Sequence, residues 1–158
     1  MEKLVAFYSR TGNTKFVAEK ISEKLNADLC EVKDKKKREG KLTFLTGGLA
    51  SFRQKLTEIE VPKPVENYDF IAVGSPVWAG KMTPAIRKLL VTNDFSDKKV
   101  AFFVTLGGDK PEKSLRNMKE ATQVKLVVGE LSISNPLQNQ KNTERRVADW
   151  CIQIQKSL

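Results

Sequence analysis

Four short, continuous apolar runs constrain the fold of this chain more than any other feature. They are "LVAFY" (4–8), "FIAVG" (70–74), "VAFFVTL" (100–106) and "KLVVGEL" (125–131). They are rich in β-branched and aromatic residues and do not alternate with polar ones, which is typical of strands buried on both faces. A weaker, alternating run at 27–32 predicts an edge strand.

Amphipathic helical patterns lie between these runs. Residues 13–25 carry an apolar stripe, with Asn13 or Thr14 expected as the N-cap, and residues 83–90 offer Thr83 as N-cap followed by Pro84. Further helical patterns occupy residues 111–122 and 143–158. The alternation predicts an α/β fold with a parallel sheet and helices on both faces, in one domain that spans residues 1–158.

Residues 33–64 interrupt this alternation. They open with the basic run "KDKKKREGK" and continue as "LTFLTGGLASFRQKL" (42–56), whose apolar spacing predicts an amphipathic helix. We expect a crossover helix packed on the sheet; the alternative is an element that docks on a partner or on a membrane surface.

Composition limits the chemistry that side chains alone can perform. The chain has 158 residues, no histidine, and two cysteines far apart, so buried thiols are expected rather than a disulfide or a metal site. Imidazole acid–base catalysis is excluded, which favours chemistry supplied by a cofactor.

The net charge of +9 suits either an anionic partner or simply a solubilising surface. No apolar stretch reaches the ~20 residues of a membrane span, and no signal peptide precedes the first strand pattern, so we expect a cytoplasmic location.

Three loops of unusual composition follow strand patterns. The first is "SRTGNT": Ser9, Arg10, Thr11, Gly12, Asn13 and Thr14. Its hydroxyls, amide and glycine, followed by a helix N-terminus, predict a phosphate cradle that is neither a Walker loop nor GxGxxG. The second, within "GSPVWAGKMTP", contains Ser75, Pro76, Val77, Trp78, Ala79 and Gly80. The third contains Leu106, Gly107, Gly108 and Asp109.

The carboxyl ends of parallel strands share one edge of a sheet, so these loops should meet there. Trp78 could stack on a flat ligand, with Gly80 admitting its edge; the alternative is a ring folded back onto the protein. A Gly-Gly turn is weak evidence alone. Together the loops predict a ligand that joins an aromatic ring system to a phosphate, which fits flavin mononucleotide (FMN).

On these motifs the chain resembles the flavodoxin family over nearly its whole length. "YSRTGNT" is similar to the family's phosphate loop, and "GSPVWAG" and "TLGG" to its two flavin-ring loops. The resemblance implies strand order 2-1-3-4-5, for which flavodoxin is itself a standard example. It also implies that residues 9–14 hold the phosphate, that Trp78 stacks on the ring, that backbone near Ala79 and Gly80 meets flavin N5, and that residues 106–109 line the pyrimidine end.

Three departures from an ordinary flavodoxin stand out. The chain is strongly basic where many flavodoxins are acidic, so a redox partner should present an acidic face. Arg10 lies within the phosphate loop, and with the positive charge it predicts a less negative potential for the reduced flavin. The third loop lacks the tyrosine that many flavodoxins place there, so the second flavin face is open, or covered by Lys110, Pro111 or residues 42–56.

The resemblance leaves two main functions open. The first is an FMN-binding electron carrier between protein partners, in which no side chain is catalytic. The second is an NAD(P)H-dependent FMN oxidoreductase of the quinone or flavin reductase type, which could act as a homodimer. A binding module without flavin is a third reading, although the basic run lacks the interleaved aromatics of a nucleic-acid groove.

Overall fold

The computed structural model describes residues 1–35, 57–108 and 110–158. The predicted helix at 42–56 and the site residue Asp109 therefore lie outside the described residues. Five parallel strands form one sheet in the order β2-β1-β5-β6-β7, which is the predicted order 2-1-3-4-5 counted along that sheet. The strands are β1 (Lys3–Phe7), β2 (Asp28–Glu31), β5 (Phe70–Pro76), β6 (Lys99–Leu106) and β7 (Val127–Ser134).

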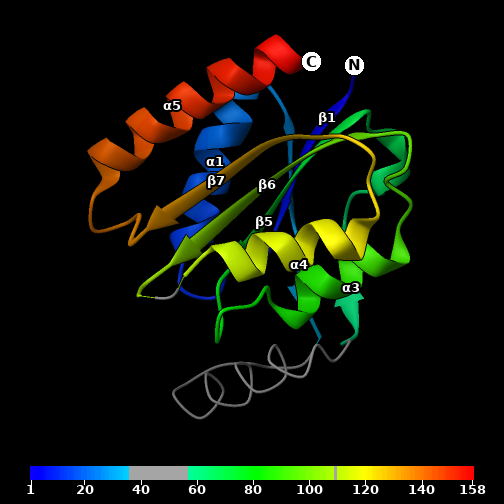
Figure 1. Cartoon of the computed structure of the whole chain (residues 1–158), viewed down its shortest axis with the longest axis horizontal. Coiled ribbons are helices and arrows are strands. Elements are labelled where there is room, and N and C mark those ends of the chain that lie inside the picture. Colours follow the sequence, from blue (N-terminus) through cyan, green and yellow to red (C-terminus); the bar gives the residue numbers. More distant parts are fainter. Residues whose placement is uncertain (36–56, 109) are drawn as a thin grey trace.

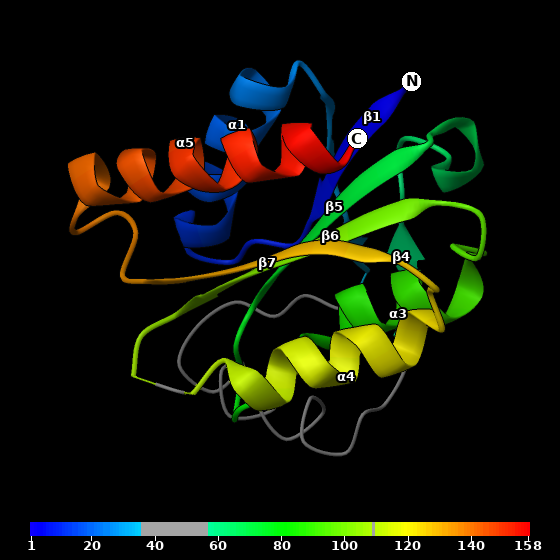
Figure 2. The same ribbon diagram turned by 45° about the horizontal axis from the view of Figure 1, so that its top comes forward.

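Helices cover both faces of this sheet (Figures 1 and 2). α1 (Asn13–Leu25) and α5 (Gln140–Ser157) lie on one face, and α3 (Pro84–Thr92) and α4 (Glu112–Thr122) lie on the other. Alternate residues of β1 feed the two resulting cores: Val5 and Phe7 pack with α1 and α5, whereas Leu4 and Ala6 pack with α3. The α/β architecture expected from the sequence is confirmed.

The central strands are buried as their apolar runs predict, but β7 is different. Every residue of β6 from Val100 to Thr105 is buried, whereas β7 is an edge strand with only Leu131 and Ile133 buried. The prediction that the run at 125–131 is buried on both faces is therefore wrong. An edge strand pairs with only one neighbouring strand. Gly129 lies against Trp150 and Ile154 of α5, so β7 has a single well-packed face, the one that faces this helix.

Gly74 on β5 explains how the phenylalanine-rich β6 fits beside it. An ideal Cβ at Gly74 would lie 2.1 Å from Phe103 Cζ, so the ring occupies the space of a side chain. Both cysteines are buried and free, as expected, and burial raises the pKa of the Cys151 thiol to about 12.

Two short strands and one helical turn complete the described structure. β3 (Lys33–Asp34) pairs antiparallel with β4 (Ile59–Glu60), which the sequence did not predict, and η1 (Val65–Asn67) leads into β5. No helix among the described residues is long and apolar enough to cross a membrane.

Candidate functional site

A pocket of about 150 Å³ lies where the carboxyl ends of β1, β5, β6 and β7 meet. Four different strand-to-helix connections contribute to its wall, as expected for an open parallel sheet. The lining residues are Arg10, Thr11, Asn13, Pro76, Val77, Trp78, Thr105, Leu106, Gly107 and Asn135. Eight of them belong to the predicted set, and Thr105 and Asn135 do not.

The β1–α1 loop is shaped by Gly12, whose φ of 88° is in the left-handed region that favours glycine. Gly12 is the N-cap of α1, so the prediction of Asn13 or Thr14 as cap is wrong. The Asn13 side chain instead donates to Thr11 Oγ1 (3.0 Å) and accepts from Leu137 N–H (3.3 Å). The Asn13 side chain therefore joins the β1–α1 loop to the loop after β7, and the start of α1 has no side-chain cap.

The backbone donors at this helix end are available for a ligand. Lys15 N–H donates to Ser9 Oγ at 3.2 Å, and Phe16 N–H donates to Gly12 O at 2.9 Å. The N–H groups of residues 11–14 donate to no acceptor among the described residues. Unpaired N–H groups at the positive end of a helix form a ready site for an anion.

The β5–α3 loop contains a tight turn with mutual backbone bonds. Trp78 N–H donates to Lys81 O at 2.9 Å and Lys81 N–H donates to Trp78 O at 3.0 Å. Ala79 and Gly80 between them have φ of 50° and 74°, the pattern of a type I′ turn. Glycine adopts this geometry readily, but for Ala79 it carries backbone strain.

Ser75 lies beneath this turn and does not line the pocket. Its hydroxyl is fully buried, accepts from Thr83 N–H at 3.0 Å and donates to Pro76 O at 2.9 Å. Thr83 in turn accepts from Ile86 N–H at 3.4 Å as the N-cap of α3, and Pro84 takes the first helical position, as predicted. The Ser75 and Thr83 hydroxyls are therefore satisfied within the protein, whereas the N–H groups of Ala79 and Gly80 at the tip of the turn donate to no acceptor among the described residues.

Trp78 is folded back onto the protein, with only 3% of its surface exposed. Its ring meets Tyr8 edge to face, with centroids 5.7 Å apart and an interplanar angle of 87°. The Arg10 guanidinium lies over the same indole, 5.5 Å from the ring centroid, a cation–π geometry. Arg10 therefore contacts the β5–α3 loop instead of pointing away into solvent.

Lys81 adds positive charge beside the turn. It is buried, and its pKa is lowered by burial first and then by the charges of Lys113 and Arg87. Lys113 comes within 3.9 Å of the position of a Cβ on Gly80. Cations from the β5–α3 loop and from α4 thus lie near each other beside the turn.

The third predicted loop and an unpredicted fourth one close the pocket. Gly107 lines it, while Gly108 faces open space. Asn135, after β7, donates through its N–H to Leu106 O (2.9 Å) and through its side chain to Gly107 O (3.4 Å). The dipeptide Asn135-Pro136 directly after the last strand pattern is a turn signal that could have identified this wall.

The predicted residues divide clearly by position. Those that line the pocket are Arg10, Thr11, Asn13, Pro76, Val77, Trp78, Leu106 and Gly107. Those that support it from neighbouring positions are Ser9, Gly12, Thr14, Ser75, Ala79, Gly80 and Gly108. A buried hydrogen bond between the hydroxyls of Thr14 and Thr105 (2.7 Å) joins the first loop to the end of β6.

Comparison with known proteins decides the family. The model of the flavodoxin family matches residues 50–154, which is most of the chain. The chain belongs to the flavodoxin family. No curated protein matches it.

Solved structures agree with this family. A flavoprotein from Lactobacillus acidophilus in complex with FMN is 26% identical, with a TM-score of 0.70 over 89% of this chain and 97% of its own. The apo-form of the flavoprotein from that organism is 28% identical, with a TM-score of 0.63 over 87% and 95%. Oxidised flavodoxin 2 from Bacillus cereus is similar in fold, with 19% identity, full coverage of both chains and a TM-score of 0.67.

Proposed function

We propose that this member of the flavodoxin family binds FMN in the pocket at the carboxyl edge of the sheet and carries electrons between redox partners. The observation that carries the proposal is the row of unpaired N–H groups at residues 11–14, which opens beside the pocket. The similarity to a flavoprotein in complex with FMN supports the same ligand.

The residues present fit the two ends of FMN. The first loop offers neutral donors and a helix N-terminus to the phosphate, with no acidic side chain between residues 8 and 16. Pro76, Val77 and Trp78 offer apolar surface to a ring, and Gly107 offers backbone. The pocket is smaller than the roughly 300–1,000 Å³ typical of ligand sites, so it accommodates part of the ligand and the rest lies across its mouth.

Arg10 affects how a flat ligand could use Trp78. Because the guanidinium lies over the indole, a ring that stacks on that face has to displace it. The charge would then be free to approach the phosphate, which links ring stacking to phosphate binding. Stacking and phosphate binding are linked in this way because Arg10 belongs to the β1–α1 loop but contacts Trp78 of the β5–α3 loop.

Bound FMN would supply the redox chemistry, since flavins transfer one or two electrons. The lining side chains are hydroxyls, amides, apolar groups and one guanidinium. Such groups bind and orient a ligand and adjust its electrostatic surroundings, and none of them is suited to moving protons at pH 7. We therefore assign the chain's own residues to binding and tuning.

An anaerobic titration of the purified protein with FMN, followed by NADH and then NADPH, tests the proposal through the visible spectrum. A carrier binds FMN and stays oxidised with both nucleotides. Rapid bleaching at catalytic protein concentration would make the protein an NAD(P)H-dependent FMN oxidoreductase instead. If FMN does not bind, the first loop holds another phosphate, and family membership gives the fold without the function.

A further inference from the structure

Among the described residues, positive charge is concentrated at the pocket edge of the sheet. The segments at this edge, 8–16, 76–88, 106–116 and 134–146, contain eleven basic residues and, among the described positions, two acidic ones. The segments at the opposite edge, 1–3, 24–28, 62–70, 92–99, 122–127 and 156–158, contain seven basic and six acidic residues. The two edges of one sheet therefore differ strongly in net charge.

Most of these pocket-edge cations are not used to hold the protein together. Arg10 and Lys81 make contacts described above. The other nine form no ion pair with any described residue: Lys15, Arg87, Lys88, Lys110, Lys113, Arg116, Lys141, Arg145 and Arg146. Glu144, one of the two acidic residues, is instead engaged by Lys20 at 3.4 Å.

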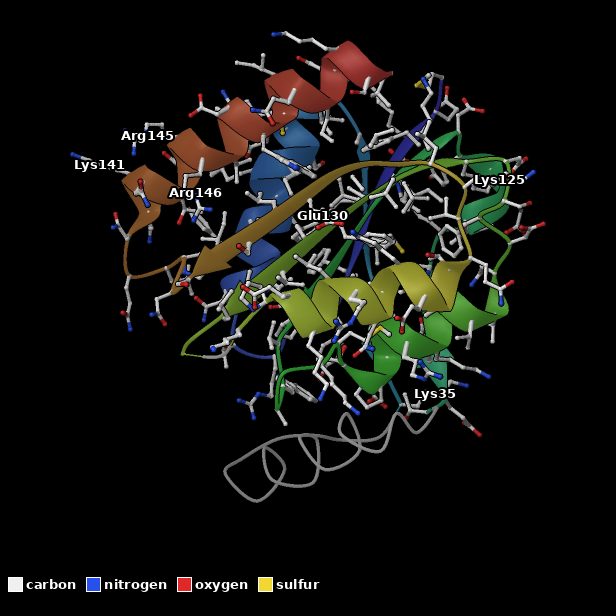
Figure 3. All side chains as sticks on the ribbon, viewed as in Figure 1. Lys35, Lys125, Glu130, Lys141, Arg145 and Arg146 are labelled. Atoms are coloured by element: carbon white, nitrogen blue, oxygen red, sulfur yellow. The ribbon has the colours of Figure 1, made fainter. Side chains whose placement is uncertain are left out.

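The start of α5 shows that this placement does not serve helix stability. Lys141, Arg145 and Arg146 are all exposed in its first two turns, and its first turn contains no acidic residue. Figure 3 shows these three side chains at one end of the molecule, with Lys125 at the other. A cation in the first turn of a helix, such as Lys141, opposes the helix dipole by about 0.3–1 kcal/mol, so an external partner better explains its position.

We propose that this edge is a docking surface for the acidic face of a redox partner protein, with Lys141, Arg145 and Arg146 forming one side of it. The proposal rests on the proposed function, because it places the partner over the mouth of the FMN pocket. Asn135 lines that pocket, and only a short loop separates it from α5. Charge complementarity around a redox centre steers association and speeds encounter.

A protein fits this surface better than a nucleic acid does. The cations are spread over four loops and helix starts around the pocket, instead of following one groove. The exposed large apolar residue described at this edge is the aliphatic Leu137, whereas single-stranded nucleic acids stack on exposed aromatic rings. An aliphatic residue among cations resembles the mixed surface of a transient protein interface.

The test measures association of the FMN-loaded protein with the acidic soluble domain of cytochrome b5 by calorimetry, between about 20 and 300 mM NaCl. The test variant is Lys141→Glu/Arg145→Glu/Arg146→Glu. The control, Lys24→Glu/Lys125→Glu/Lys156→Glu, makes the same change in net charge at the opposite edge. We expect the test variant to bind about tenfold to a hundredfold more weakly at low salt, and the control to bind within about threefold of wild type.

Equal weakening in both variants would overturn the proposal, because only net charge would then matter. Tighter binding of a short DNA duplex than of cytochrome b5 at the same salt, lost in the test variant, would also overturn it. FMN affinity is measured first for all three proteins. Absence of FMN binding in the wild type contradicts the proposed function, whereas normal FMN binding without edge-specific association contradicts only the docking surface.

Discussion

The loop after β1 and the loop after β5 border the same pocket but treat their polar groups differently. The β5–α3 loop pairs most of its groups through Ser75, Thr83 and the Trp78–Lys81 turn, and leaves N–H groups without a described acceptor mainly at the tip of that turn, at Ala79 and Gly80. The β1–α1 loop leaves four consecutive backbone donors unpaired within the described structure. Buried polar groups must find partners, so the first arrangement builds a scaffold and the second reserves donors for a ligand. Substitutions should therefore affect stability in one loop and affinity in the other.

The largest expected effect is on the scaffold side, at Trp78. Trp78→Ala removes a ring that is 3% exposed, so the free energy of unfolding of the apo-protein should fall by about 3–5 kcal/mol. FMN binding should weaken by about 1–3 kcal/mol, borrowing the magnitude of base–aromatic stacking. Urea unfolding and FMN titration measure the two effects, and Trp78→Phe, which keeps a ring, should recover part of both. Unchanged FMN affinity in a folded Trp78→Ala protein would leave Trp78 a purely structural role.

A pair of serine substitutions tests the comparison directly. Ser75→Ala leaves the buried N–H of Thr83 without its acceptor, so unfolding should require about 1–3 kcal/mol less. Ser9→Ala removes an acceptor from an exposed bond to Lys15 N–H and should change stability by less than about 0.5 kcal/mol. Chemical denaturation of both apo-proteins is the measurement. Equal losses at the two serines would remove the distinction between the loops.

Thr11→Val probes the ligand side alone. Thr11 is exposed and its hydroxyl accepts from Asn13, so we expect stability within about 0.5 kcal/mol of wild type. Loss of a polar group beside the phosphate should weaken FMN by about 1 kcal/mol and leave riboflavin, which has no phosphate, unaffected. Parallel fluorescence titrations with the two flavins decide it. Equal weakening of both would mean that the first loop does not recognise phosphate.

The smallest expected effect comes from the strained turn. Ala79→Gly relieves a φ of 50° and should raise the free energy of unfolding by about 0.5–1 kcal/mol. Gly12→Ala makes the opposite change in the β1–α1 loop. Because Gly12 has a φ of 88°, alanine there should lower the free energy of unfolding. Thermal unfolding of both variants shows whether each is more or less stable than the wild type. A destabilised Ala79→Gly protein would show that the turn gains from its methyl group.

The apolar runs were sufficient to predict a parallel sheet, because buried parallel strands need near-continuous apolar sequence. The order of its strands followed from the resemblance to flavodoxins. Two local features could not be read in this way. β7 begins with the apolar residues typical of a central strand, but it continues with Gly129, Glu130 and Ser132 and lies at the edge, where one side is exposed. The cap of α1 depends on the backbone conformation of Gly12, whereas residue type alone favoured Asn13 or Thr14.

Eight of the ten residues that line the pocket belong to the set predicted from loop composition, and their binding of FMN stays a prediction. The missing wall, Asn135, comes from a fourth loop whose polar residues resemble an ordinary turn. The contact between Arg10 and Trp78 could not be predicted either, because it joins residues 68 positions apart and depends on how two loops fold over each other. Loop composition therefore identified most of the surface, and tertiary packing determined which side chains occupy it.

The hydroxyl bond between Thr14 and Thr105 has a thermodynamic consequence for a ligand made of two parts. It fastens the start of α1, where we propose that the phosphate binds, to the end of β6, which borders the proposed site of the ring. Ordering one end therefore lowers the entropy that the other must lose, so the two halves of FMN should bind cooperatively. Inorganic phosphate would then increase the affinity for riboflavin, and the protein would recognise the whole cofactor better than the sum of its fragments.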